Sequence, residues 1–137
     1  NHQQNEIVCS AKSQNESFTR GTIAAFFAQI NPTVEQINDL KTAVSEAVTN
    51  CIVHGYKGKD GMIDISADLY ENSIYVEITD YGSGIADVQK AMEPFFTTVS
   101  TGERSGIGFT VMQAFCDDVQ VSSVVGSSTT VKLTKAV

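Results

Sequence analysis

The sequence lacks several features that would assign it to a specialised class of protein. It has no tryptophan, only two prolines among 137 residues, and no apolar run near the roughly 20 residues of a membrane-spanning helix. Basic residues are scarce: 9 lysines and arginines face 16 acidic residues, for a net charge of −7. Proteins that bind nucleic acid or an anionic membrane usually present a basic face, so this composition argues against both partners.

Cysteine is also sparse. Cys9, Cys51 and Cys116 lack metal-type spacing and lie in apolar patterns, so we expect reduced core thiols in a cytoplasmic protein. The first nine residues lack the basic and apolar regions of a signal peptide, which fits the same compartment. With 42% apolar and 18% charged residues the chain has a globular balance, and its length suits a single domain over residues 1–137.

The hydrophobic pattern predicts helices and antiparallel strands in separate runs. The expected order is a strand at 6–11, helices at 14–29 and 34–54, strands at 63–69 and 74–79, a short helix ending near 92, an aperiodic loop at 93–105, a helix at 105–116, and strands at 119–125 and 129–135. Ser13 with Glu16, and Thr33 with Gln36, match capping boxes for the first two helices. Gly55 is placed to end the second helix. The expected apolar anchors of the first helix are Phe18, Ile23, Phe26, Phe27 and Ile30. This order predicts an α+β fold: a two-layer sandwich with a mostly antiparallel sheet and helices on one face.

The second predicted helix carries an unusual polar stripe. Glu46, Asn50 and His54 are spaced four residues apart and therefore follow one side of the helix. Spacing alone favours a solvated face, but the neighbours on that side are small or apolar: Ala43, Ala47 and Val53. We interpret the stripe as the wall of a cleft. There a glutamate can accept a proton and an asparagine carbonyl can bind Mg²⁺, while His54 either donates to a phosphate or ends the helix.

Two glycine-containing boxes follow. In residues 80–85, Gly82 and Gly84 would let the backbone approach a ligand, and Asp80 can accept from the exocyclic amine of adenine. Residues 104–109 open a helix, where free backbone N–H groups together with Arg104 form an anion site. Taken singly, each box also fits an ordinary glycine turn. Neither matches a Walker A loop, a Rossmann fingerprint or a kinase HRD or DFG motif.

A loop with two adjacent phenylalanines connects the boxes. Such residues usually pack in the core, but Phe95 and Phe96 could also act as a lid over a nucleotide, with Thr97 and Thr98 meeting phosphate.

These segments together resemble the GHKL nucleotide-binding superfamily, which includes gyrase-type ATPases, Hsp90 and sensor histidine kinases. Residues 46–50 are similar to its N box, 80–84 to its first glycine box, 106–108 to its second, and 94–96 to the F box of histidine kinases. Residues 13–18, 45–50, 54–56, 96–98 and 103–110 further resemble the anti-sigma-F factors of spore-forming bacteria. That resemblance implies a GHKL-type fold and a serine protein kinase, usually dimeric, that uses ATP or ADP with Mg²⁺. It also implies two partners, a sigma factor that is inhibited and an anti-anti-sigma protein that is phosphorylated.

The resemblance also assigns roles by position. Glu46 would be the general base for the substrate hydroxyl, Asn50 the magnesium ligand and Asp80 the reader of adenine. Thr130 would support adenine through a water, and Arg20 would contact a partner or be an ordinary surface arginine. Arg104 would contact the terminal phosphate. The full set of expected nucleotide-binding residues is Asn50, His54, Gly55, Asp80, Gly82, Gly84, Ile85, Thr97, Thr98, Arg104, Ser105, Gly106, Ile107, Gly108, Phe109 and Thr130.

Other functions stay open at this point. A nucleotide-dependent binding module would sequester the sigma factor without transferring phosphate. The related anti-sigma kinase of a stress-response system shares these motifs. The catalytic domain of a sensor histidine kinase is disfavoured, because the chain holds no phosphoacceptor helix pair.

Overall fold

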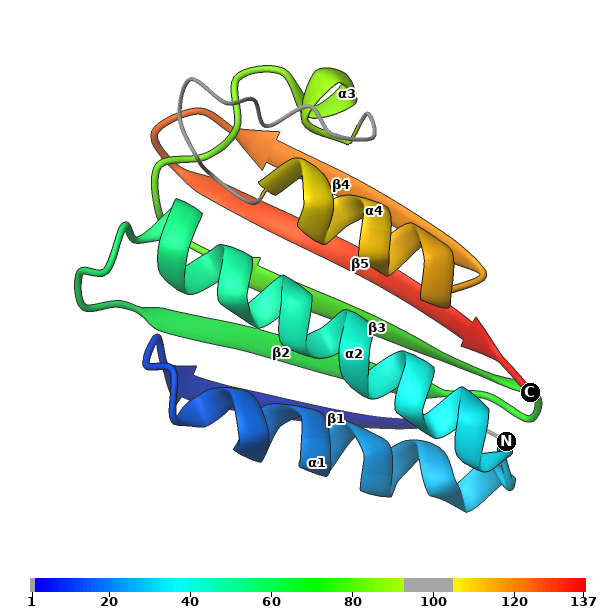
Figure 1. Cartoon of the computed structure of the whole chain (residues 1–137). Coiled ribbons are helices and arrows are strands. Elements are labelled where there is room, and N and C mark those ends of the chain that lie inside the picture. Colours follow the sequence, from blue (N-terminus) through cyan, green and yellow to red (C-terminus); the bar gives the residue numbers. More distant parts are fainter. Residues whose placement is uncertain (1, 93–104) are drawn as a thin grey trace.

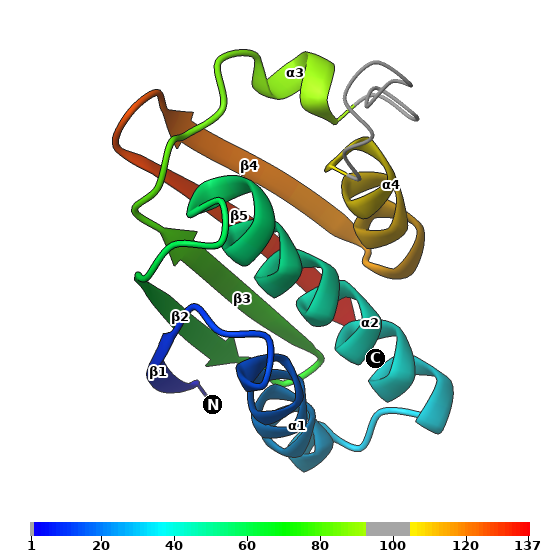
Figure 2. The same cartoon turned by 60° about the vertical axis from the view of Figure 1, so that its left-hand side comes forward.

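Helices and strands separate into two layers, as Figures 1 and 2 show. The structure, a computed structural model, describes residues 2–92 and 105–137, with the backbone alone at 105–107. The elements in chain order are β1 (Gln3–Ser10), α1 (Asn15–Phe27), the 3-10 turn η1 (Ala28–Ile30), α2 (Val34–Asn50), the π-helical turn η2 (Cys51–Gly55), β2 (Met62–Leu69), β3 (Ser73–Asp80), α3 (Val88–Ala91), α4 (Ser105–Phe115), β4 (Asp118–Val124) and β5 (Ser128–Ala136). The strands form one antiparallel sheet in the order β1-β2-β3-β5-β4. Helices α1, α2 and α4 cover one face of it (Figure 2), which confirms the predicted α+β sandwich.

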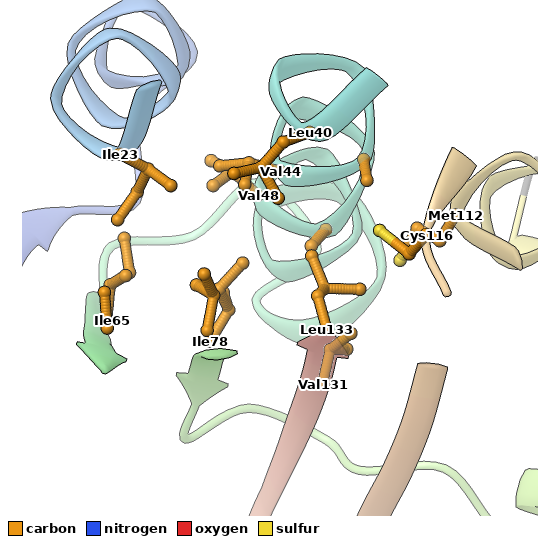
Figure 3. Packing of buried hydrophobic residues seen from close by; sticks show 14 of the residues in the cluster. Ile23, Leu40, Val44, Val48, Ile65, Ile78, Met112, Cys116, Val131 and Leu133 are labelled. Atoms are coloured by element: carbon orange, nitrogen blue, oxygen red, sulfur yellow. The ribbon is translucent and has the colours of Figure 1, made fainter. Parts of the chain in front are cut away.

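The core lies between these helices and the sheet, as the close view in Figure 3 shows. Leu40, Val44 and Val48 of α2 are fully buried against inward-facing strand residues such as Ile78 and Leu133. This arrangement follows from the two periodicities: every third or fourth residue of a helix and every second residue of a strand face the same layer boundary. All three cysteines are free and buried, as expected of core thiols.

One expected anchor of α1 is wrong. Ile23, Phe26 and Phe27 are buried, but Phe18 is 54% exposed. Five residues separate Phe18 from Ile23, which places the two side chains about 140° apart around the helix. Phe18 therefore points away from the sheet.

The two expected capping boxes have different outcomes. At α2, the Thr33 hydroxyl accepts from Gln36 N (3.1 Å) and the Gln36 side chain accepts from Thr33 N (2.8 Å), so this box is confirmed. At α1 the N-cap is Gln14, without a side-chain cap, so the Ser13–Glu16 box is wrong. Backbone turns replace it, because Glu16 N donates to Ser13 O and so no longer needs a side-chain acceptor.

The first strand is longer than its sequence predicts. It begins at Gln3, and its register with β2 runs from Gln3 opposite Leu69 to Ser10 opposite Met62. Polar residues at its start have little strand preference of their own, so the ladder with β2 holds them extended. Within the two described ranges no helix combines the length and the apolar character that crossing a bilayer requires.

Candidate functional site

A cavity of about 740 Å³ opens between the C-terminal end of α2 and the sheet. Its volume lies in the range of small-molecule sites, roughly 300–1,000 Å³. The described lining comes from α2, η2 and the segment after it, the end of β3 and the loop that follows, α3, α4 and β5. Residues of the expected site that line it are Asn50, His54, Gly55, Asp80, Gly84, Ile85 and Phe109. Segments far apart in sequence therefore meet at this cavity, whereas Glu46, Gly82 and Thr130 lie outside its lining.

Glu46 and Asn50 face the first turns of α4. A Cβ built on Gly108 would lie 3.2 Å from both terminal atoms of the Asn50 amide and 3.3 Å from Glu46 Oε2. Glycine at this position lets α4 approach two polar side chains of α2. Asn50 Nδ2 is buried and has no hydrogen-bond partner in the described part of the chain. Leaving a buried donor unpaired costs about 1–3 kcal/mol, so the arrangement fits a ligand that brings acceptor oxygens to this amide.

The start of α4 is the segment expected to bind an anion. The helix begins at Ser105, as predicted, and the first four N–H groups of any helix have no partner within it. Gly106 and Ile107 also belong to this first turn, and the side chains at 105–107 are not described. Thr97, Thr98 and Arg104, together with the Phe95–Phe96 lid, lie outside the described residues.

Asp80 forms a buried acceptor in the cavity wall. Its residue is 3% exposed, and Oδ1 accepts from Gly82 N (3.0 Å). Burial raises the pKa of Asp80 above its ordinary value, against the opposing effect of hydrogen bonds from Gly82 N–H and the Cys51 thiol. Burial, followed by the charge of Asp80, raises the pKa of Cys51 well above its ordinary value, so that side chain stays a thiol. The carboxylate keeps free lone pairs that suit an exocyclic amine.

Gly55 and Gly82 lie where two segments of the protein approach each other closely. A Cβ on Gly55 would lie 2.6 Å from Asp80 Oδ1, and a Cβ on Gly82 would collide with Gly55 O. Two hydrogen bonds from Ser83 stabilise the same contact: its N donates to Gly55 O (2.9 Å) and its Oγ donates to His54 O (3.2 Å). These glycines therefore let two protein backbones approach each other. The helical segment ends at Gly55, as predicted, although the positive φ values belong to Lys57 and Gly58 (53° and 79°).

Gly84 holds the same loop against the β4–β5 turn. Its φ is 73°, and a Cβ there would collide with Val124 O. Gly126 N donates to Ser83 O (2.7 Å) across this contact. Both glycine positions after β3 are thus required by neighbouring backbone.

Of two adjacent threonines, Thr129 lines the cavity and Thr130, the one expected there, does not. Thr129 is buried, lines the cavity and lies directly opposite Asp80 in the β3–β5 register. Thr130 does not line it; its hydroxyl contacts the Thr79 hydroxyl (2.8 Å) on the other face of the sheet. Alternation along the strand could have shown this, because Thr129 shares a face with the apolar Val131 and Leu133.

Other site features escaped sequence reasoning. Cys51 was expected only as a core thiol, although its position next to Asn50 makes it part of the cavity wall below Asp80. Lys57 also lines the cavity, and no local pattern distinguishes it from a surface lysine. Arg20 is half-buried on α1 and its Nη1 donates to Ser45 Oγ (3.5 Å), so it does not belong to the cavity lining.

Known proteins are similar to this chain in sequence and in fold. The histidine kinase-like ATPase domain family matches residues 9–135. An anti-sigma F factor of Thermoanaerobacter sp. is 56% identical over 130 residues, which covers 95% of this chain and 91% of that protein. The chain belongs to the anti-sigma F factors.

Further relatives agree. The anti-sigma F factor of Bacillus velezensis is 50% identical over 127 residues, covering 92% of this chain and 87% of its own. A solved structure of the RsbU and RsbW domains of a Mycobacterium tuberculosis protein matches with a TM-score of 0.70 over 98% of this chain, at 20% identity. This chain spans 32% of that protein, and the likeness shows the fold alone. The resemblance to the GHKL superfamily and to the anti-sigma-F factors is confirmed.

Proposed function

We propose that this anti-sigma F factor binds a sigma factor and, with ATP and Mg²⁺, phosphorylates a serine of an anti-anti-sigma protein. One observation carries the proposal. The buried, unpartnered amide nitrogen of Asn50 lines the same cavity as the buried Asp80, and the Asn50 and Glu46 side chains both lie next to Gly108 in α4. The names of the relatives support the sigma-factor partner, and the motif resemblance supports the phosphorylated partner.

The cavity fits an adenine nucleotide in one orientation. Acceptors at Asp80 and Thr129 suit the amine of adenine, and the apolar Ile85, Phe109 and Val131 suit the faces of its ring. The phosphates then extend toward Asn50 and the free N–H groups of α4, where the helix dipole favours negative charge. This polarity, with an acceptor end and a donor end, supports a nucleotide over an uncharged ligand.

The residues present also fit a single Mg²⁺ ion. The described residues contain no group of three His, Cys, Asp or Glu side chains that could hold a metal alone. Mg²⁺ usually binds one or two protein oxygens together with substrate phosphates, and the Asn50 side-chain carbonyl oxygen would be that ligand. When bound, the ion would neutralise charge on the phosphates.

Glu46 is the proposed general base. The serine oxygen of the substrate forms a bond to the γ-phosphorus of ATP as its proton passes to the Glu46 carboxylate. The bond from that phosphorus to the β–γ bridging oxygen breaks, and its electron pair leaves with ADP. Arg104 would spread the charge of the γ-phosphate.

A homodimer and a cytoplasmic location stay predictions.

Transfer of labelled phosphate tests the proposal. We expect γ-labelled ATP to label the purified anti-anti-sigma protein on serine. Glu46→Gln should lower the rate at least about 100-fold, because general-base catalysis contributes about 10²–10⁴-fold. Nucleotide affinity should stay within about threefold of wild type, since Gln keeps the size of the side chain. Glu35→Gln, an exposed residue in the first turn of the same helix, is the matched control.

Three results would contradict parts of the proposal. Sequestration of the sigma factor without any labelling would favour the binding module that transfers no phosphate. Undiminished transfer by Glu46→Gln would remove Glu46 from the role of base. Failure of the wild-type protein to bind ATP by calorimetry would overturn the nucleotide site itself.

A further inference from the structure

The Thr129 hydroxyl lies where a second adenine-reading group would be needed. Thr129 is 7% exposed, lines the cavity and is the register partner of Asp80, so the two side chains project side by side from β5 and β3. A carboxylate can only accept hydrogen bonds, but a hydroxyl can either donate or accept. What Thr129 offers to a ligand therefore depends on where its proton goes.

Ser123 on β4 decides the position of that proton. Its Oγ donates to Ser128 O (2.9 Å), which uses its single hydrogen because a carbonyl oxygen can only accept. The same Oγ accepts from Ile85 N (2.7 Å) and contacts the Thr129 hydroxyl at 2.8 Å. A serine oxygen has one hydrogen and two lone pairs, so these three contacts use its whole capacity. In the contact with Ser123, Thr129 must be the donor.

We infer that Ser123 is a positioning residue for nucleotide selection: by holding the Thr129 proton, it leaves the cavity with two adjacent acceptors, Thr129 and Asp80. The 6-amino group of adenine has two N–H hydrogens and matches this pair. A 6-oxo purine brings an acceptor oxygen to the same place, where it meets lone pairs and no donor. The inference rests on the proposed nucleotide site and extends it to the selection of 6-aminopurines.

The neighbouring residues provide matched controls. Ser122 precedes Ser123 on β4 but is exposed on the opposite face of the sheet. Thr79 and Thr130 form a comparable hydroxyl pair on that opposite face, 2.8 Å apart. Substitutions there change the sheet by a similar amount without touching the cavity.

The experiment compares the affinities of ATP and inosine triphosphate, which has a 6-oxo group, by calorimetry. We expect wild type and Ser122→Ala to prefer ATP equally. Ser123→Ala frees the Thr129 proton to turn toward the ligand, so the ATP-to-ITP affinity ratio should fall about three- to tenfold, the value of one neutral hydrogen bond. Ser123→Thr keeps the hydroxyl and should keep the ratio. Thermal melts establish that each variant is folded.

Ser123 also accepts a hydrogen bond from Ile85 N, so Ser123→Ala could change the ratio by moving the loop after β3. A double variant separates this effect from the orientation of the Thr129 hydroxyl. In a Thr129→Val background there is no hydroxyl to orient, so adding Ser123→Ala should leave the ratio unchanged. The inference is overturned if Ser123→Ala leaves the ATP-to-ITP affinity ratio unchanged, or if it lowers that ratio equally in the Thr129→Val background. In either case, ATP binding by the wild-type protein would still support the proposed site. Wild-type protein that binds neither nucleotide would overturn the site, and the inference with it.

Discussion

The two ends of α2 meet the sheet in opposite ways. In its first half, Leu40 is fully buried and fills the space above the strands (Figure 3). At its C-terminal end, Ala47 and Asn50 border a cavity of about 740 Å³. One helix thus completes the core at one end and leaves it open at the other.

The difference separates stability from function. Filled space contributes dispersion and hydrophobic free energy, whereas the open end keeps buried polar groups that lack full compensation. The unpartnered amide nitrogen of Asn50 and the raised pKa of Asp80 are two such costs. Substitutions at the two ends should therefore separate into those that change folding and those that change binding.

The largest expected effect is at the filled end. Leu40→Ala should lower the free energy of unfolding by about 2–5 kcal/mol, because it removes buried methyl groups and leaves a void. Urea denaturation measures this change. Folded variant protein should bind ATP within about threefold of wild type, and a large loss of affinity would contradict the separation of the two ends.

Next in size is a glycine substitution at the open end. Gly82→Ala places a Cβ against Gly55 O, where backbone meets backbone, and should cost about 1–3 kcal/mol of stability together with nucleotide affinity. Gly21→Ala is the control, since nothing lies within 4 Å of a Cβ in that helical position. It should stabilise the protein by about 0.5–1 kcal/mol, as alanine favours helix. If both substitutions changed the stability in the same direction, the close approach of Gly82 to Gly55 O would be contradicted.

Asp80→Asn should act in opposite directions on binding and on stability. ATP affinity should fall about 10- to 100-fold, because the amine loses a charged acceptor. The nucleotide-free protein should melt at a higher temperature near neutral pH, since the buried charge is removed. Asp60→Asn, whose side chain is 93% exposed, is the control.

The pH dependence follows from the same residue. Because the pKa of Asp80 is raised in the folded state, folded protein binds more protons than unfolded protein between the ordinary value of 3.8 and the raised value. The contribution of Asp80 to stability is therefore greatest below this window and declines as pH rises through it. The difference in melting temperature between wild type and Asp80→Asn should grow with pH across the window. A constant difference would contradict a raised pKa.

The smallest effect tests the distant start of α2. Thr33→Ala breaks the capping box and should cost about 1 kcal/mol of stability. ATP affinity should stay within twofold, because the cap lies at the end of the helix far from the cavity. A selective loss of binding in calorimetry would show that the two ends are coupled.

Local patterns in the sequence were enough to predict most elements and part of the site. The spacing of Glu46, Asn50 and His54 depends only on helical geometry, so the stripe could be identified without coordinates. The alternation in β2 and β3 likewise predicted the hairpin and its inward face. The predictions fail where contacts with a neighbouring segment override the local pattern, as at the polar start of β1, which pairs with β2.

The sequence by itself determined the order of elements, the layer each would face and the motifs that mark a nucleotide site, because these follow from periodicities of a few residues. Only the tertiary structure decided that Gly82 is needed for the close approach to Gly55 and that Gly84 is needed beside the β4–β5 turn. It also decided that Cys51 supports Asp80. Those outcomes depend on register and backbone approach between segments that are distant in the chain, and no local pattern encodes such distances.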